Sequence, residues 1–158
     1  MATPGTINVA QYRRIVVLTG AGSSVRLWVA DLSRGGRVVE RRQRAAVRDC
    51  RGGQAGPAGC LEFFAQMRTL IAEAVPSVAH RALARLAETL TSGQALTILT
   101  QNVDGLQQLA GSKAVVELHG SLHRSRCTRC DYSRSENLAL TSAECPECPS
   151  SPLLLPCS

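Results

Sequence analysis

Long apolar segments and aromatic side chains are both scarce in this chain of 158 residues. No apolar run approaches the roughly 18 residues that a membrane span needs, and the N-terminal residues lack the apolar segment of a signal peptide. We therefore expect a cytoplasmic protein without a membrane segment. Aromatic residues make up only 3% of the chain, yet 44% of it is hydrophobic. That balance is typical of a globular domain and excludes a disordered chain.

The chain is basic, with a formal net charge of +6, but the charge is concentrated in one segment. Seven arginines and two acidic residues lie between Arg34 and Arg51, so this segment carries +5 of that charge. Patches that bind nucleic acid ordinarily include lysines and interleaved aromatic residues, and this segment has neither. We therefore interpret it as a solvated face and do not expect nucleic acid as a partner.

Apolar periodicity predicts an alternation of strands and helices. Three short apolar runs are typical of buried strands: 14–19, 97–100 and 115–118. Apolar residues at helical spacing predict three helices, the second with Ser77 as its N-cap: 61–75, 79–90 and about 104–109. Residues 25–59 show no sustained period, and we expect them to be irregular.

The alternation indicates an α/β fold with a parallel sheet. Ligands of such sheets bind at the carboxyl ends of the strands. Gly20, Gln101 and His119 follow the three predicted strands, so we expect a ligand near them.

Gly20, Ala21 and Gly22 directly follow the first strand. Glycines at this place let backbone amides approach a phosphate, because no Cβ blocks the contact. The third glycine of the dinucleotide-binding fingerprint is missing, however. An ordinary strand-to-loop turn explains the same residues, so the motif by itself leaves both interpretations open.

Gln101, Asn102 and Asp104 place three hydrogen-bonding side chains directly after the second strand. Asn and Asp commonly cap helices, which is a structural explanation for them. His119 also has a structural explanation as a lone histidine in a turn. An imidazole at a strand end that carries a ligand is equally suited to act as a general base near neutral pH.

Four of the seven cysteines form two Cys-x-x-Cys pairs, Cys127 with Cys130 and Cys145 with Cys148. In a reducing compartment such pairs indicate metal ligands before disulfides. Their spacing suits tetrahedral zinc, and four thiolates leave no open coordination position. We therefore predict a structural zinc site. The other three cysteines have no partner at such spacing, and we predict that they are free thiols: Cys50, Cys60 and Cys157.

Five sequence blocks, in this order, resemble the sirtuin family of NAD-dependent protein lysine deacylases, in a bacterial-type form. They are GAG with Ser24, PSVAH ending at His80, TQNVDGL from Thr100, ELHGSL from Glu117, and the two cysteine pairs. The resemblance implies a partial Rossmann-like parallel-sheet domain with an inserted zinc-ribbon module. It assigns residues 10–122 to an incomplete NAD-binding domain and residues 123–158 to the zinc-binding module.

The resemblance also implies a reaction, in which the acyl group of a protein lysine is transferred to ADP-ribose and nicotinamide is released. The cofactors would be NAD and Zn²⁺, and the partners proteins with acylated lysines. His119 would be the catalytic base, and Cys127, Cys130, Cys145 and Cys148 the zinc ligands. The implied NAD-binding residues are Gly20, Ala21, Gly22 and Ser24 at the phosphates, and Gln101, Asn102, Val103 and Asp104 around the ribose and nicotinamide.

The chain departs from the family directly after Ser24. The family has a Ser-Gly-Leu-Pro-Thr-Phe-Arg loop followed by Gly-Ala-Gly-Gly-Leu-Trp, where this chain reads VRLWVADLSRGGRVVE. The genetic code permits residues 27–39 to spell the family loop when the bases are read one position along. Our hypothesis is a frame-shifted segment at about 25–59, which sequencing of the encoding DNA would test.

The chain also stops at Ser158, before the remaining Rossmann elements of the family. We expect this polypeptide alone to be poorly stable and to have little deacylase activity, because apolar faces of its sheet would lack their cover. Two other functions stay open at this point. The chain could be an inactive sirtuin fragment, or its zinc ribbon could be a stand-alone module that binds protein or nucleic acid.

Overall fold

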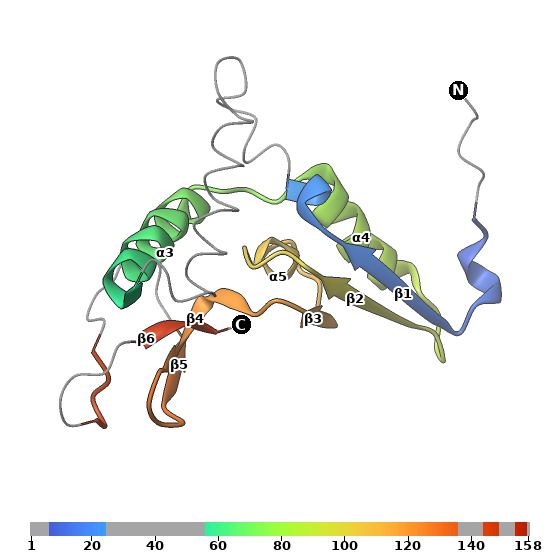
Figure 1. Cartoon of the computed structure of the whole chain (residues 1–158). Coiled ribbons are helices and arrows are strands. Elements are labelled where there is room, and N and C mark those ends of the chain that lie inside the picture. The colour runs from blue at the N-terminus through green and yellow to red at the C-terminus, as the bar shows by residue number, and fades with distance from the viewer. Residues whose placement is uncertain (1–6, 25–55, 136–143, 149–153, 158) are drawn as a thin grey trace, which may run out of the picture.

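A computed structural model describes residues 7–24, 56–135, 144–148 and 154–157 (Figure 1). The arginine-rich segment between Arg34 and Arg51, Cys50 and most of the proposed frame-shifted segment lie outside these residues. The described parts form one parallel and one antiparallel sheet, each of three strands, with helices beside them.

The parallel sheet has the strand order β1-β2-β3, with β1 at Arg14–Thr19, β2 at Ala95–Thr100 and β3 at Val115–Glu117. Val17 pairs with Ile98, and Ile98 pairs with Val115, so all three strands run in one direction. The sequence prediction of three parallel strands is confirmed. The second strand begins two residues earlier than predicted, and the third ends one residue earlier.

Three α-helices occur in the described residues: α3 at Gly56–Ala72, α4 at Val78–Thr89 and α5 at Leu106–Leu109. Two 3₁₀ turns precede them in the chain, at Val9–Gln11 and Ala21–Ser24. The prediction that residues 25–59 are irregular is wrong for residues 56–59, which form the first turn of α3. Pro57 lies in that turn, where a missing backbone N–H costs no intrahelical hydrogen bond.

Helix α4 begins where the sequence predicted, with Ser77 as its N-cap. Helix α5 is shorter than predicted, because residues 104 and 105 precede it and do not join it. The carboxylate of Asp104 accepts a hydrogen bond of 3.0 Å from the Leu106 N–H and so caps the helix from two residues before its start.

Both faces of the parallel sheet are apolar, but only one is covered. Leu96, Ile98 and Thr100 of β2 are buried on one face, and α4 lies alongside β1 and β2 (Figure 1). Val16 and Leu18 point to the opposite face and are each 62% exposed. Parallel sheets are ordinarily covered on both faces, so half of this sheet's packing surface is open in the described residues.

The antiparallel sheet has the order β5-β4-β6, with β4 at Ser121–Cys127, β5 at Ser133–Ser135 and β6 at Leu154–Cys157. Helix α3 lies beside β4 and β6 (Figure 1). Its Arg68 donates from Nε to the Leu122 carbonyl at 2.8 Å and from Nη2 to the Ser125 hydroxyl at 2.7 Å. These two hydrogen bonds attach the helix to the first half of β4.

Cys60 lies in α3, is buried and is disulfide-bonded. The prediction that it is a free thiol is therefore wrong. A disulfide needs two cysteines that the fold brings within about 7 Å between Cα atoms, and spacing along the chain does not show such an approach. The same prediction for Cys50 and for the side chain of Cys157 falls outside the described residues.

Among the described helices, none combines the length and the apolar character that a membrane crossing requires.

Candidate functional site

The carboxyl ends of the parallel strands meet at one edge, and three predicted site residues lie there. Gly20 follows β1, Gln101 follows β2, and His119 lies two residues beyond β3. The Gln101 N–H donates to the Thr19 carbonyl at 3.0 Å, and a Cβ placed on Gly20 would lie 3.7 Å from the Gln101 Oε1 atom. The structure therefore brings Gly20 and Gln101 together, as the strand pattern predicted.

The turn after β1 is closed by its own serine. Both the backbone N–H and the hydroxyl of Ser23 donate to the Gly20 carbonyl, at 3.0 and 2.8 Å. Ala21 is exposed, and a Cβ placed on Gly22 would meet no atom within 4 Å. The turn thus presents a rigid, open glycine surface, which a phosphate group could approach closely.

Asn102 holds this turn from the end of β2. Its side-chain Nδ2 lies 3.0 Å from each of three acceptors in the turn, the Gly20 carbonyl and the hydroxyls of Ser23 and Ser24. The Ser24 hydroxyl in turn donates to the Asp104 carboxylate at 2.7 Å. The two predicted loops are therefore one hydrogen-bonded unit, and Asp104 combines the helix-capping role with a contact in the site.

The beginning of α4 forms a third part of this unit. The Ser77 hydroxyl donates to the Ser23 carbonyl at 2.8 Å, and the Ser77 N–H donates to His80 Nδ1 at 3.0 Å. Because Nδ1 accepts, the proton of the neutral imidazole lies on Nε2. That nitrogen is buried, and no described residue gives it a partner.

Burial lowers the pKa of His80, and the neighbouring Arg81 lowers it further, while the charge of Asp104 opposes both. A buried neutral imidazole beside the site is therefore the stable form. His80 lies within the predicted helix 79–90, and no catalytic part was assigned to it from the sequence. The PSVAH block was the one signal that connected it with the other site residues.

His119 and Val103 differ in their surroundings. His119 is exposed in the turn after β3, where the following Gly120 has a φ of 79°. Val103 is half-buried, and its carbonyl accepts a hydrogen bond of 2.9 Å from the Leu122 N–H of β4. Val103 therefore connects the loop after β2 with the antiparallel sheet, whereas His119 is free to meet a ligand from solvent.

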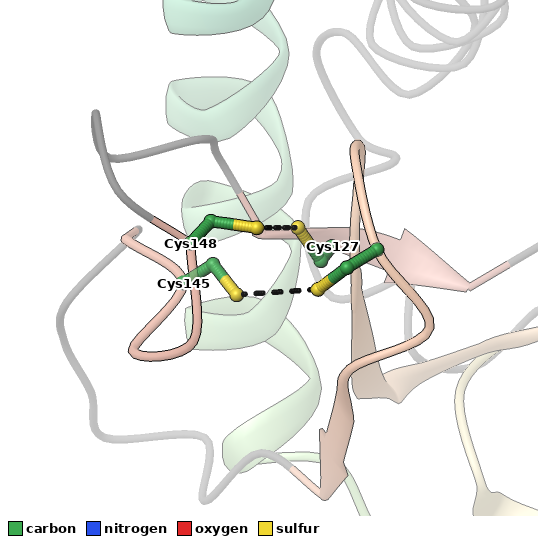
Figure 2. Close-up of side chains that lie close together, drawn as sticks. Cys127, Cys145 and Cys148 are labelled. Carbon is green, nitrogen blue, oxygen red and sulfur yellow. Dashed lines mark hydrogen bonds between the residues drawn. The ribbon is translucent and has the colours of Figure 1, made fainter.

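The four cysteines of the two pairs gather at one end of the antiparallel sheet (Figure 2). Their sulfur atoms all lie within 4.8 Å of one another. Cys127 is 3.9 Å from Cys148, and Cys130 is 3.7 Å from Cys145. Zn–S bonds of about 2.3 Å in a tetrahedron place the sulfurs about 3.8 Å apart. The donor set therefore fits a tetrahedral zinc ion.

The thiols of this cluster have unequal acidities. Burial alone would raise the pKa of Cys127, but N–H groups of Cys130 and Arg129 and the neighbouring thiols lower it to about 7. Contact with the Cys130 thiol, together with burial and the other two cysteines, raises the pKa of Cys148 to about 12. Cys127 is therefore poised to be the first thiolate, and a cation is needed to hold all four deprotonated.

Fold and site together define an α/β protein of the nucleotide-binding kind with a four-cysteine module. A sequence profile of the Sir2 family matches residues 20–155. The chain belongs to this family.

Relatives of this chain are named NAD-dependent protein deacetylases or deacylases. The chain is 45% identical over 89 residues to an NAD-dependent protein deacetylase of Cutibacterium acnes, a match that covers 55% of this chain and 35% of the relative. It is 32% identical over 153 residues to an NAD-dependent protein deacylase of Thermococcus sibiricus, covering 90% of this chain and 58% of the relative. The chain therefore spans between about a third and three fifths of the length of these relatives.

Solved structures show the same fold. A mutant Sir2 homologue in complex with ADP-ribose superposes with a TM-score of 0.76 at 30% identity, covering 94% of this chain and 59% of that one. A complex of a Sir2 homologue with NAD gives a TM-score of 0.69 at 28% identity and covers 94% and 57% of the two chains. The predicted α/β class with a partial Rossmann-like sheet and a cysteine module is confirmed.

Proposed function

We propose that this chain carries the NAD site of a protein lysine deacylase of the Sir2 family. The observation that supports it most is the hydrogen-bonded unit of Ser24, Asn102 and Asp104 beside the open surface of Gly22. It lies at the strand ends, where α/β sheets bind their ligands. Relatives named NAD-dependent protein deacylases and homologues solved with NAD or ADP-ribose support the same proposal.

Within this proposal the turn after β1 faces the phosphates of NAD. Gly20, Ala21 and Gly22 offer backbone without an obstructing Cβ, and Ser24 orients the turn through its contact with Asp104. Gln101, Asn102, Val103 and Asp104 line the ribose and nicotinamide. Asn102 already donates to three atoms of the turn, so its proposed part is to fix the two halves of the site relative to each other.

His119 is the proposed general base. When bound, NAD supplies the ribose carbon that accepts the acyl oxygen as nicotinamide leaves. The exposed imidazole of His119, held at the end of β3, would take a proton from a ribose hydroxyl of the bound cofactor. Its position beyond a strand and before a glycine with positive φ leaves it room to approach the sugar.

The cysteine cluster has a proposed structural part. Cys127, Cys130, Cys145 and Cys148 would hold one Zn²⁺, which when bound closes the antiparallel sheet and supplies no open coordination position. We assign residues 10–122 to the NAD-binding domain and 123–158 to this module. We also propose a cytoplasmic location, where thiolate ligands persist.

Calorimetric titration of the purified full chain with NAD tests the cofactor site. Saturation at 100 times the dissociation constant should stabilise the chain by about 2.7 kcal/mol in a thermal shift. An acetyl-lysine peptide then tests the reaction, and we expect His119→Ala to keep NAD binding while it abolishes deacetylation of the peptide. Turnover retained by His119→Ala would exclude His119 as the base.

The same titration separates the alternatives. NAD binding without deacylation by the unaltered chain would support a non-catalytic Sir2 fragment. No effect of NAD on a folded, zinc-loaded chain would support a stand-alone module, because the cysteine cluster and its antiparallel sheet do not need the strand-end site.

A further inference from the structure

We propose that His123 is a positioning residue, which holds the turn at Asp104 and Gly105 in the shape that the cofactor site uses. His123 belongs to β4, the strand that ends at Cys127 of the cysteine cluster. The inference rests on the NAD site proposed above and adds to it a residue from the other sheet.

A hydrogen bond joins His123 to the loop after β2. Its Nε2 lies 2.9 Å from the Asp104 carbonyl oxygen. A carbonyl oxygen only accepts, so the imidazole nitrogen donates. The preceding residue acts in parallel, because the Leu122 N–H donates to the Val103 carbonyl at 2.9 Å. Two consecutive residues of β4 thus hold two consecutive carbonyls of the proposed ribose and nicotinamide loop.

Gly105 shows how closely the imidazole lies on this loop. Its φ is 70°, in the left-handed region that favours glycine. A Cβ placed there would be 2.5 Å from His123 Nε2 and 2.7 Å from His123 Cδ2. The glycine is therefore required twice, once for the backbone conformation and once for the imidazole above it.

Asp104 makes this contact relevant to the site. Its carbonyl accepts from His123, while its carboxylate accepts from the Ser24 hydroxyl and from the Leu106 N–H. A change of the turn at the carbonyl moves the carboxylate on the same residue. Since Ser24 belongs to the glycine turn, His123 influences the distance between the two halves of the site. Displacements of about 1 Å in such a site matter for binding and rate.

Hydrogen bonds from a neighbouring helix hold the strand that carries His123. Arg68 of α3 donates to the Leu122 carbonyl and to the Ser125 hydroxyl, on both sides of His123. Leu122 and Ser125 are buried. The imidazole therefore projects from a fixed strand onto the loop and can restrain it.

Hydrogen exchange of the zinc-loaded full chain tests the contact without any cofactor. We expect His123→Ala to speed amide exchange in residues 102–107 by about fivefold, the factor for one lost hydrogen bond. Exchange in β4 near Cys127 and the zinc content should not change. Arg126→Ala, an exposed position on the same strand, is the control and should leave residues 102–107 unaffected. Unchanged exchange in His123→Ala overturns the proposal.

NAD affinity separates positioning from a merely structural contact. We expect His123→Ala to raise the dissociation constant by about fivefold, and His123→Gln, which keeps a donor, to restore most of the affinity. Faster exchange with unchanged NAD affinity overturns the positioning role. If the unaltered chain binds no NAD, the proposed function fails on its own evidence, and the exchange rates still decide whether His123 holds the turn.

A double-mutant cycle gives an independent check. Gly105→Ala alone should speed exchange in the loop, because its Cβ would displace the imidazole. In a His123→Ala background the same change keeps the cost of the left-handed backbone but no longer meets the imidazole, so it should add less than it does in the unaltered chain. Fully additive effects of the two changes would contradict the close contact.

Discussion

The Ser24 hydroxyl donates a hydrogen bond of 2.7 Å to the Asp104 carboxylate, across 80 residues of chain. Ser24 is buried at the end of the 3₁₀ turn after β1, while Asp104 precedes the helix after β2 and caps it. This contact turns two strand-end loops into one site.

Asn102→Asp should destabilise the chain by about 2 kcal/mol. The change replaces the Nδ2 donor with an oxygen that faces the Gly20 carbonyl and two hydroxyls, so these partly buried acceptors lose a donor. Urea unfolding followed by circular dichroism measures the loss. Gln66→Glu makes the same amide-to-carboxylate change at an exposed position of α3 and should stay within about 0.5 kcal/mol. Equal stability of the two variants would contradict the role of Asn102.

Zinc content should depend on the cysteine cluster alone. Elemental analysis of the purified chain should find one zinc per chain, and Cys145→Ser should reduce it to near zero because a tetrahedral site needs all four donors. Cys50→Ser, outside the two pairs, should retain the metal. Chelation should unfold the antiparallel sheet before the parallel one, as seen by hydrogen exchange. A Cys145→Ser chain that keeps its zinc would rule out this ligand set.

Zinc binding should release protons, so the affinity of the chain for zinc should rise with pH. Cys148, whose pKa is about 12 in the metal-free cluster, must lose its proton to become a ligand. Cys127, whose pKa is about 7, is largely deprotonated already above that pH and becomes protonated below it. Zinc affinity should therefore fall steeply as the pH drops below about 7. Calorimetry in buffers of different ionisation enthalpy counts the protons, and a count of zero would contradict a protonated Cys148 in the metal-free cluster.

Stability should fall on acidification because of His80. Burial lowers its pKa in the folded chain below the ordinary value of 6.5, so the unfolded chain binds the proton more readily. Its contribution is complete above pH 6.5 and is lost as the pH falls from there toward the lowered pKa. His80→Gln should flatten this dependence in urea unfolding between pH 7.5 and 5.5. An equally steep curve for His80→Gln would contradict the buried neutral imidazole.

Local patterns predicted much of the scaffold. The apolar runs at 14–19 and 115–118 predicted strands because a buried parallel strand needs apolar side chains on both faces. Ser77 predicted the start of α4 because its hydroxyl satisfies an N–H that the helix leaves free. The spacing within each Cys-x-x-Cys pair predicted a metal cluster because two ligands so close in sequence can reach one ion. Each of these properties is contained in a few neighbouring residues.

Other features did not follow from any local pattern. Residues 56–59 begin a helix although they lack an apolar period, and Cys60 is disulfide-bonded although its spacing indicated a free thiol. His80 had no separate signal, and only packing shows that it is buried with an unpartnered Nε2. The spacing of neighbouring residues shows none of these three features.

The sequence by itself thus determined the α/β class, the family resemblance and the four cysteines that the fold gathers in one cluster. Tertiary structure alone decided that Ser24 meets Asp104 and that His123 lies on Gly105. The physical reason is the separation along the chain of the groups that interact. Helix capping, strand burial and ligand spacing act between near neighbours, whereas those two contacts exist only because whole strands and helices dock in one register.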